Sequence, residues 1–165
     1  FLSGKVNSIN IVTRTKRKKT GETNYFSLNE LKPALEGRTH IINVLPLTKE
    51  TFNFINSKSL KFFPKDVYYI NAGRGETNDM EEIKKISKKG LIRGCSMDVF
   101  GLPNGEIKRE LLELDNFTLT PHISGWTKNF WDSQKSLCKK NIKLFQKKDF
   151  KNMKNLVFIQ GNLIK

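Results

Sequence analysis

Short apolar runs alternate with helical stretches along this chain, and that alternation limits the fold more than any other feature. The apolar runs predict strands at Ser8–Thr13, His40–Val44, Val67–Asn71, Gly94–Val99 and Phe117–Thr120. Strands that alternate with helices favour an α/β fold, a doubly wound parallel sheet with helices on both faces. Ligands of such sheets bind beyond the carboxyl ends of the strands, which is where this chain concentrates its polar and glycine-rich motifs.

Helix signals stand between the predicted strands. Ser27 and Glu30 have the spacing of a capping box, and Pro33 should keep the helix that follows short. Other helices are expected from Thr48 to Phe54, from Ser57 toward Phe62, from Asn78 or Asp79 to Gly90, near Lys108–Leu112, and from Lys128 to Gln146. We expect one domain over residues 1–148 and a C-terminal tail over 149–165, in which Leu156–Gln160 is a strand-like patch.

Charge and composition narrow the classes of partner. Lys and Arg number 30 against 16 Asp and Glu, a formal net charge of +14, and the densest basic cluster lies at 14–19. That cluster has two interpretations, a local phosphate site or part of a generally basic surface. No nucleic-acid-binding signature accompanies the charge, so we expect no nucleic-acid partner. No apolar run approaches the ~20 residues of a membrane-spanning helix, so no membrane partner is expected either.

The two cysteines, Cys95 and Cys138, form neither a metal-binding spacing nor a disulfide framework. We therefore expect no metal site, and a reducing, cytoplasmic location.

Three residues at predicted strand ends have side chains suited to chemistry. Arg74 lies between two glycines, Gly73 and Gly75, where a planar guanidinium can meet a carboxylate. Asp98 ends the fourth predicted strand, and His122 follows Thr120-Pro121 at the end of the fifth. A histidine in that place can act as an acid or a base near neutral pH.

Four motifs carry a resemblance to a known family. They are Leu45-Pro46-Leu47-Thr48 with Thr51, the stretch Ile70-Asn71-Ala72-Gly73-Arg74-Gly75, the stretch Met97-Asp98-Val99-Phe100, and the stretch Leu119-Thr120-Pro121-His122-Ile123-Ser124-Gly125-Trp126. In this order and spacing they resemble the Rossmann-like nucleotide-binding domain of the D-isomer-specific 2-hydroxyacid dehydrogenases, over about Ile9 to Gly125. The resemblance implies hydride transfer between NAD or NADP and a 2-oxo or 2-hydroxy acid.

The resemblance also implies roles for individual residues. Arg74 would clamp the substrate carboxylate and polarise the oxo group, and His122 would give or take the hydroxyl proton. Asp98 would receive the nicotinamide amide. Further contacts with the cofactor are implied at Leu45, Pro46, Thr51, Ala72, Gly73, Arg74 and Gly125. The small-molecule acid is the expected partner, together with a second copy of the protein in a homodimer.

The chain departs from the family pattern in two places. The family has a glutamate five residues past the aspartate, to orient the histidine, and this chain has Pro103 there, with Glu106 as the nearest carboxylate. No G-x-G-x-x-G occurs, so the family's first strand and phosphate loop are expected to precede Phe1, and its substrate domain to lie elsewhere. We thus expect an inactive fragment of an oxidoreductase; the alternative is a degenerate, non-catalytic nucleotide-binding or regulatory relative.

Two further expectations concern the preferred cofactor and the order of the strands. The predicted strand Ser8–Thr13 ends at Thr13 and Arg14, with no acidic residue to hold the ribose hydroxyls, so NADP is favoured over NAD, or else this is a solvated basic turn. In the doubly wound order, loss of the first strand would also separate His40–Val44 from Val67–Asn71. Leu156–Gln160 is the internal candidate to fill that gap, or it is a surface tail.

Overall fold

The structure of the chain is a computed structural model that describes residues 4–14, 18, 20–100, 109–127, 129–155, 158–159 and 162–163. Its strands are β1 (Ile9–Val12), β2 (Thr23–Phe26), β3 (His40–Asn43), β4 (Val67–Asn71), β5 (Ile92–Met97), β6 (Phe117–Leu119), β7 (Phe158–Ile159) and β8 (Asn162–Leu163). Its helices are α1 (Leu31–Leu35), α2 (Ser57–Leu60), α3 (Met80–Lys88), α4 (Arg109–Leu112) and α5 (Phe130–Gln146), with 3-10 turns η1 (Leu28–Glu30), η2 (Gly75–Thr77) and η4 (Phe150–Asn152).

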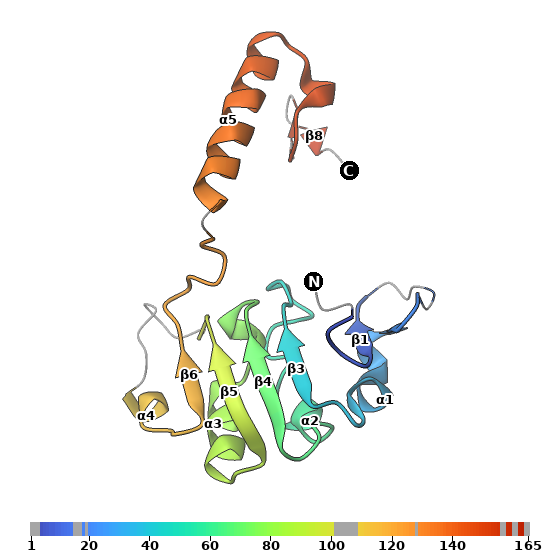
Figure 1. Cartoon of the computed structure of the whole chain (residues 1–165), viewed down its shortest axis with the longest axis vertical. Helices are drawn as coiled ribbons and strands as arrows, with labels where there is room; N and C mark the ends of the chain where they lie inside the picture. The colour runs from blue at the N-terminus through green and yellow to red at the C-terminus, as the bar shows by residue number, and fades with distance from the viewer. Residues whose placement is uncertain are drawn as a thin grey trace. The chain divides into compact units, whose positions relative to one another are not determined.

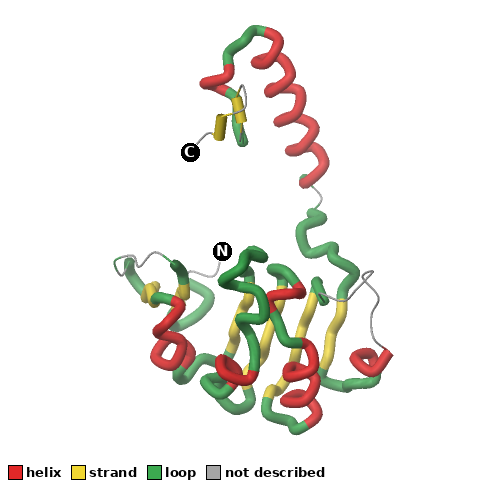
Figure 2. The backbone as a smooth tube through the Cα atoms, turned by 180° about the vertical axis from the view of Figure 1, so that it is seen from behind, coloured by secondary structure: helices red, strands yellow, loops and turns green. Residues whose placement is uncertain are grey.

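A four-stranded parallel sheet in the order β3-β4-β5-β6 forms the centre of the first part of the chain (Figure 1). Helices α2 and α3 pack on one face of this sheet, in front of the strands in Figure 2. Tyr69, Met97 and Ile83 are fully buried in the core between that face and the helices. The arrangement confirms the predicted α/β fold with a parallel sheet, and it brings the carboxyl ends of the four strands to one edge.

Local signals in the sequence account for most of the element boundaries. β4 has the predicted bounds, and β3, β5 and β6 begin or end within two residues of them. The Asp79 side chain caps α3 by accepting the Glu82 N–H at 3.2 Å, and Gly90 closes the helix with φ +64°. The Glu30 carboxylate accepts both the N–H and the hydroxyl of Ser27 at 2.8 Å, so the predicted capping box heads η1 and the short α1.

The predicted helix from Thr48 to Phe54 is wrong, because the segment folds as successive turns. The Thr51 hydroxyl donates to Pro46 O at 2.5 Å and accepts the Thr48 N–H at 2.8 Å. These local bonds compete with the bonding pattern of a helix, a known tendency of threonine side chains.

The prediction about the gap in the sheet is also wrong. β3 pairs directly with β4, with His40 opposite Tyr68 and Asn43 opposite Asn71. Instead, β1 forms a separate two-stranded parallel sheet with β2, a strand that the sequence pattern did not predict. The described part of the Leu156–Gln160 patch, β7, pairs with β8 in an antiparallel hairpin and does not enter the four-stranded sheet. The rest of that patch lies outside the described residues.

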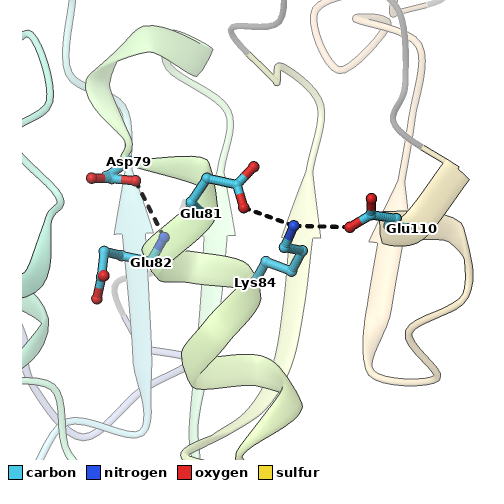
Figure 3. A network of polar contacts seen from close by, with 5 residues as sticks. All are labelled: Asp79, Glu81, Glu82, Lys84 and Glu110. Carbon is cyan, nitrogen blue, oxygen red and sulfur yellow. Dashed lines mark hydrogen bonds and ion pairs between the residues drawn. The ribbon is translucent and has the colours of Figure 1, made fainter.

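An ion-pair network ties α3 to α4 (Figure 3). Lys84 Nζ lies 2.7 Å from Glu81 Oε2 on its own helix and 2.9 Å from Glu110 Oε2 on α4. The Lys84 side chain is only 18% exposed, so its long stem packs along the surface while the charge bridges two helices. These bonds raise the pKa of Lys84, chiefly through Glu110, and lower the pKa of Glu110.

The chain divides into two compact units, residues 1–122 and 123–165. The second unit contains α5, η4 and the β7–β8 hairpin, with Asn141 bonded through its side chain to the backbone of Lys154. The domain boundary expected at residue 148 stays a prediction. Across the described residues, every helix is too short or too polar to cross a lipid bilayer.

Candidate dinucleotide and substrate site

The segments that follow β4, β5 and β6 stay side by side after the strands end. Asp98 N–H donates to Asn71 O at 3.0 Å, and Thr120 N–H donates to Met97 O at 2.9 Å. The ladder therefore continues for one residue beyond β5 and β6, which holds the predicted site residues along one edge of the sheet.

The loop after β4 presents Arg74 on the surface. Asn71, fully buried, accepts Gly73 N–H at 3.1 Å and donates to Arg74 O at 3.3 Å, so one amide side chain closes the loop on itself. Arg74 is exposed, and its Nη1 donates to Gly73 O at 2.8 Å. The guanidinium has further N–H donors in the same plane, and these can form a pair of hydrogen bonds with a carboxylate at this edge. Beside it, Ala72 is exposed, and its N–H donates to Asn43 O at 3.0 Å.

Gly73 lies directly against the loop that follows β3. A Cβ added at Gly73 would lie 2.8 Å from Leu45 O and 2.9 Å from Leu45 N, closer than side-chain atoms approach a backbone. Glycine is therefore required by the close contact of the two loops. Leu45 is half-buried and Pro46 exposed, whereas Thr51 is buried and its hydroxyl is bonded inside the loop, so Thr51 shapes the loop from within.

Asp98 is the buried carboxylate of the site, with 6% of the residue exposed. The Thr120 hydroxyl donates to Asp98 Oδ1 at 2.5 Å. A charged hydrogen bond of this kind offsets part of the cost of burying a carboxylate and fixes its direction. Asn71 Nδ2 also donates to Val99 O at 3.4 Å, which connects the Asp98 segment to the Arg74 loop.

His122 is exposed and has a positive φ of 55°. Its N–H donates to Thr120 O at 3.0 Å, closing a tight turn around Pro121. Positive φ is uncommon outside glycine, and non-glycine residues in this region are often found at functional sites. Through Thr120, the histidine turn and the Asp98 carboxylate are joined in one short hydrogen-bonded segment.

Three other predicted site residues, Thr13, Arg14 and Gly125, lie outside the segments that follow β4, β5 and β6 as far as His122. Thr13 is half-buried at the end of β1, with its N–H bonded to Phe26 O at 2.9 Å, and Arg14 is exposed just after it. Arg14 helps to lower the pKa of Glu50, after larger effects from the Thr48 hydroxyl and the Glu50 backbone. Gly125 is exposed in the second unit. Residues 101–108, with Pro103 and Glu106, lie outside the described residues, as do 15–17 and 19.

The sequence pattern did not single out the polar residues that hold the loops. Asn71 and Thr120 belong to the family-like motifs. The only sequence signal for their structural roles is that each is a polar residue just before a turn, glycine-rich after Asn71 and proline-containing after Thr120. Among the described residues, no group of three or more His, Cys, Asp or Glu side chains is placed to bind a metal ion.

A parallel sheet with a buried carboxylate, an exposed arginine and a histidine at consecutive strand ends has the architecture of the α/β proteins that bind dinucleotides beyond the carboxyl ends of their strands. The donor set fits such a cofactor, because the buried Asp98 carboxylate can accept hydrogen bonds from an amide at the sheet edge. Residues 5–124 match the family model described as D-isomer specific 2-hydroxyacid dehydrogenase, NAD binding domain. The chain belongs to this family, as its motifs predicted.

Individual relatives agree with this assignment. A glyoxylate reductase of Pyrococcus horikoshii is 30% identical over 135 residues, which cover 82% of this chain and 40% of the relative. A D-isomer specific 2-hydroxyacid dehydrogenase from Xanthobacter autotrophicus, solved in complex with NADPH and MES, has a TM-score of 0.73 and 25% identity, covering 86% of this chain and 57% of that one.

An NADPH-dependent glyoxylate/hydroxypyruvate reductase from Sinorhizobium meliloti, solved with NADP and malonate, has a TM-score of 0.72 and 27% identity, covering 84% of this chain and 42% of that one. The chain spans between 30% and 42% of the length of the curated relatives described by these matches.

Proposed function

We propose that the protein containing this chain is an oxidoreductase that transfers a hydride between NADP and a small 2-oxo or 2-hydroxy acid. The observation that carries the proposal is the single hydrogen-bonded edge on which Arg74, Asp98 and His122 follow three neighbouring strands. Relatives named glyoxylate reductase and glyoxylate/hydroxypyruvate reductase support glyoxylate and hydroxypyruvate as the first substrates to test.

Each residue has a distinct part in the proposed reaction. When bound, the dinucleotide would supply the hydride that adds to the carbonyl carbon of the 2-oxo acid. Arg74 binds the substrate carboxylate and draws electron density toward the oxo oxygen. His122 donates a proton to that oxygen as the new C–H bond forms, and takes it back in the reverse direction. Asp98 would accept a hydrogen bond from the nicotinamide carboxamide, and the Leu45–Pro46 and Ala72–Gly73 loops would hold the cofactor through their backbone.

NADP rather than NAD is proposed as the preferred cofactor. Thr13 and Arg14 stand at the end of β1 without an acidic residue, so a hydroxyl and a guanidinium are available to a 2′-phosphate. The two solved relatives described above carry NADPH and NADP respectively, which supports the same choice.

The test is a cofactor and substrate screen on the complete natural protein. NADPH oxidation with glyoxylate and with hydroxypyruvate would be measured against NADH oxidation. We expect turnover with NADPH and tighter binding of NADP than of NAD. Tighter NAD binding would reject the cofactor assignment, and no turnover with any small 2-oxo acid would reject the reaction.

A non-catalytic, nucleotide-binding or regulatory relative is the second candidate. Pro103 stands where the family has the glutamate that orients its histidine, and this substitution is the observation that favours it. Dinucleotide binding without turnover would select this candidate.

We also propose that the protein is a homodimer and that it is located in the cytoplasm. The buried Cys95, which forms no disulfide, agrees with a reducing compartment.

A further inference from the structure

A buried polar network lies beneath the loop that carries Arg74. Asn43 ends β3, Tyr69 stands in the middle of β4, and Thr77 ends η2, and all three are at most 4% exposed. Asn43 Nδ2 donates to Tyr69 Oη at 3.1 Å and to Thr77 Oγ1 at 2.9 Å. Tyr69 Oη in turn donates to Asn78 Oδ1. Burial raises the pKa of Tyr69 well above its ordinary value, so the phenol stays a neutral donor.

One end of this network reaches Arg74 itself. The Thr77 hydroxyl donates to Arg74 O at 2.6 Å, and Asn71 Nδ2 donates to the same carbonyl at 3.3 Å. Two buried side chains thus hold one backbone carbonyl from beneath. The position of that carbonyl sets where the backbone of Arg74 stands, and therefore where its guanidinium can reach.

The other end reaches the loop after β3. Asn43 Oδ1 accepts Leu45 N–H at 3.0 Å, while its backbone carbonyl accepts Ala72 N–H at 3.0 Å. Leu45 is the residue that Gly73 contacts without room for a Cβ. Asn43 is therefore bonded to both loops that face the ligand edge, and the two loops also touch each other.

Burying these polar groups inside the core costs free energy unless every donor and acceptor is bonded. Every buried side-chain nitrogen and oxygen among the described residues has a partner, so the network is complete. An apolar core would hold the sheet together equally well. The polar groups also fix the positions of the two loops, because their hydrogen bonds end on the backbone of those loops.

We propose that Thr77 is a positioning residue for Arg74, and that Asn43 holds the Arg74 loop and the Leu45–Pro46 loop in a fixed relation to each other. This inference rests on the proposed function, in which Arg74 binds the substrate carboxylate. The hydroxyl of Thr77 acts through the Arg74 backbone and touches no substrate.

The test compares Thr77→Val with Thr77→Ser in the complete natural protein. Valine keeps the shape of threonine without the hydroxyl, and serine keeps the hydroxyl. We expect Thr77→Val to lower kcat/KM for the 2-oxo acid about tenfold and to weaken binding of oxamate, a 2-oxo acid analogue, by a similar factor. Binding of NADP should change less than about twofold, and Thr77→Ser should stay within about threefold of the wild type on every measure.

Ser87→Ala is the matched control for loss of a buried hydroxyl. Ser87 is buried on α3, and its hydroxyl donates to Ile83 O at 2.8 Å, the same kind of bond made away from the strand ends. This variant should lower the melting temperature while kcat/KM and oxamate binding stay unchanged. If Thr77→Val does not fold, Asn43→Asp replaces it. The new carboxylate draws the Thr77 hydroxyl away from Arg74 O, so the same loss of oxamate binding is expected.

Three results would overturn the inference: unchanged oxamate binding in folded Thr77→Val, an equal loss in Ser87→Ala, or a Thr77→Ser variant as impaired as Thr77→Val. The proposed function fails separately if the wild type does not turn over any 2-oxo acid and if Arg74→Ala binds oxamate as tightly as the wild type does. A wild type that is active and depends on Arg74 but not on the Thr77 hydroxyl would reject the positioning role alone.

Discussion

The Thr120 hydroxyl donates a 2.5 Å hydrogen bond to the Asp98 carboxylate, and this bond joins the end of β5 to the end of β6. Thr120→Val should remove this donor, so that Asp98 is held less firmly toward the nicotinamide amide. We expect the Kd for the dinucleotide to rise about tenfold, because a bond to a charged group contributes about 1.5–3 kcal/mol. Titration calorimetry with NADP measures the change. Thr120→Ser should bind normally, as should Thr118→Val on the exposed side of the same strand, and impaired binding in Thr118→Val would contradict a specific role.

Arg74→Ala and His122→Ala should each abolish turnover in the complete protein, through loss of the carboxylate clamp and of the proton donor respectively. Arg74→Lys should also fail largely, because an ammonium group cannot make the planar double contact. The backbone of His122 has a positive φ, which asparagine adopts readily, so His122→Asn separates loss of the imidazole from backbone strain. Steady-state rates with a saturating 2-oxo acid provide the measurement, and a near-normal rate in either alanine variant would remove the assignment.

Arg14→Ala should weaken NADPH binding about tenfold and leave NADH binding within about twofold, because only NADPH carries the 2′-phosphate. The Thr48 hydroxyl lowers the pKa of Glu50 most and Arg14 only slightly, so the Glu50 carboxylate contributes negative charge within electrostatic reach of Arg14. Glu50→Gln should therefore strengthen NADPH binding. Fluorescence titration with both cofactors tests the pair of variants, with Lys18→Ala as the control for general surface charge. Equal losses for NADPH and NADH in Arg14→Ala would favour a solvated basic turn.

One of the two thiols should react with Ellman's reagent in the folded protein. Cys138 is exposed on α5, whereas Cys95 is 3% exposed, and burial raises the pKa of its thiol to about 12. The Cys95 thiolate is thus scarce at neutral pH and shielded from the reagent. Cys138→Ser should leave no reactive thiol until denaturant is added, and a fast-reacting Cys95 would contradict the buried position of β5.

The link between α3 and α4 should stabilise the protein at neutral pH and be lost in acid. Lys84 holds the pKa of Glu110 below its ordinary value of 4.5, so the stabilisation is present above that value and disappears as the pH falls through the lowered pKa. Urea midpoints of the wild type and of Glu110→Gln should differ at pH 7 and converge once the pH has fallen below the lowered pKa of Glu110. Asp115→Asn, an exposed acid on the turn after α4, serves as the control. A difference that persists at low pH would assign the effect to packing.

Strand positions and strand-end residues were predictable because they depend on local apolar runs and on the polar, glycine or proline residues that follow those runs. β4 was found in full, since the apolar run Val67–Ile70 ends in Asn71 and a glycine-rich turn. β2 was missed because Thr23–Phe26 is short and half-buried throughout, with no alternation to mark it. The order of strands failed for a different reason: the pairing of β3 with β4 joins residues on either side of a loop and a helix, and no local pattern encodes which neighbour a strand takes.

The residues that hold the site were harder to find than the residues that form it. Arg74, Asp98 and His122 are conspicuous for their chemistry and their place after strands. Asn43 and Tyr69 lie within strands, where a polar side chain is usually read as solvent-facing. Their value comes from hydrogen bonds with η2 and with the loop after β3, which only the folded chain brings together.

The direct pairing of β3 with β4 bears on how the chain folds. Each strand of the four-stranded sheet bonds to the strand that comes next in the sequence, from β3 through β6. The spatial order of the sheet is therefore the order of synthesis, and no strand has to wait for a distant partner or insert between two that are already paired. Each newly made strand extends an edge that exists when it emerges, so the sheet grows by one crossover at a time. Its contact order is therefore lower than that of a parallel sheet in which a late strand inserts between two earlier ones.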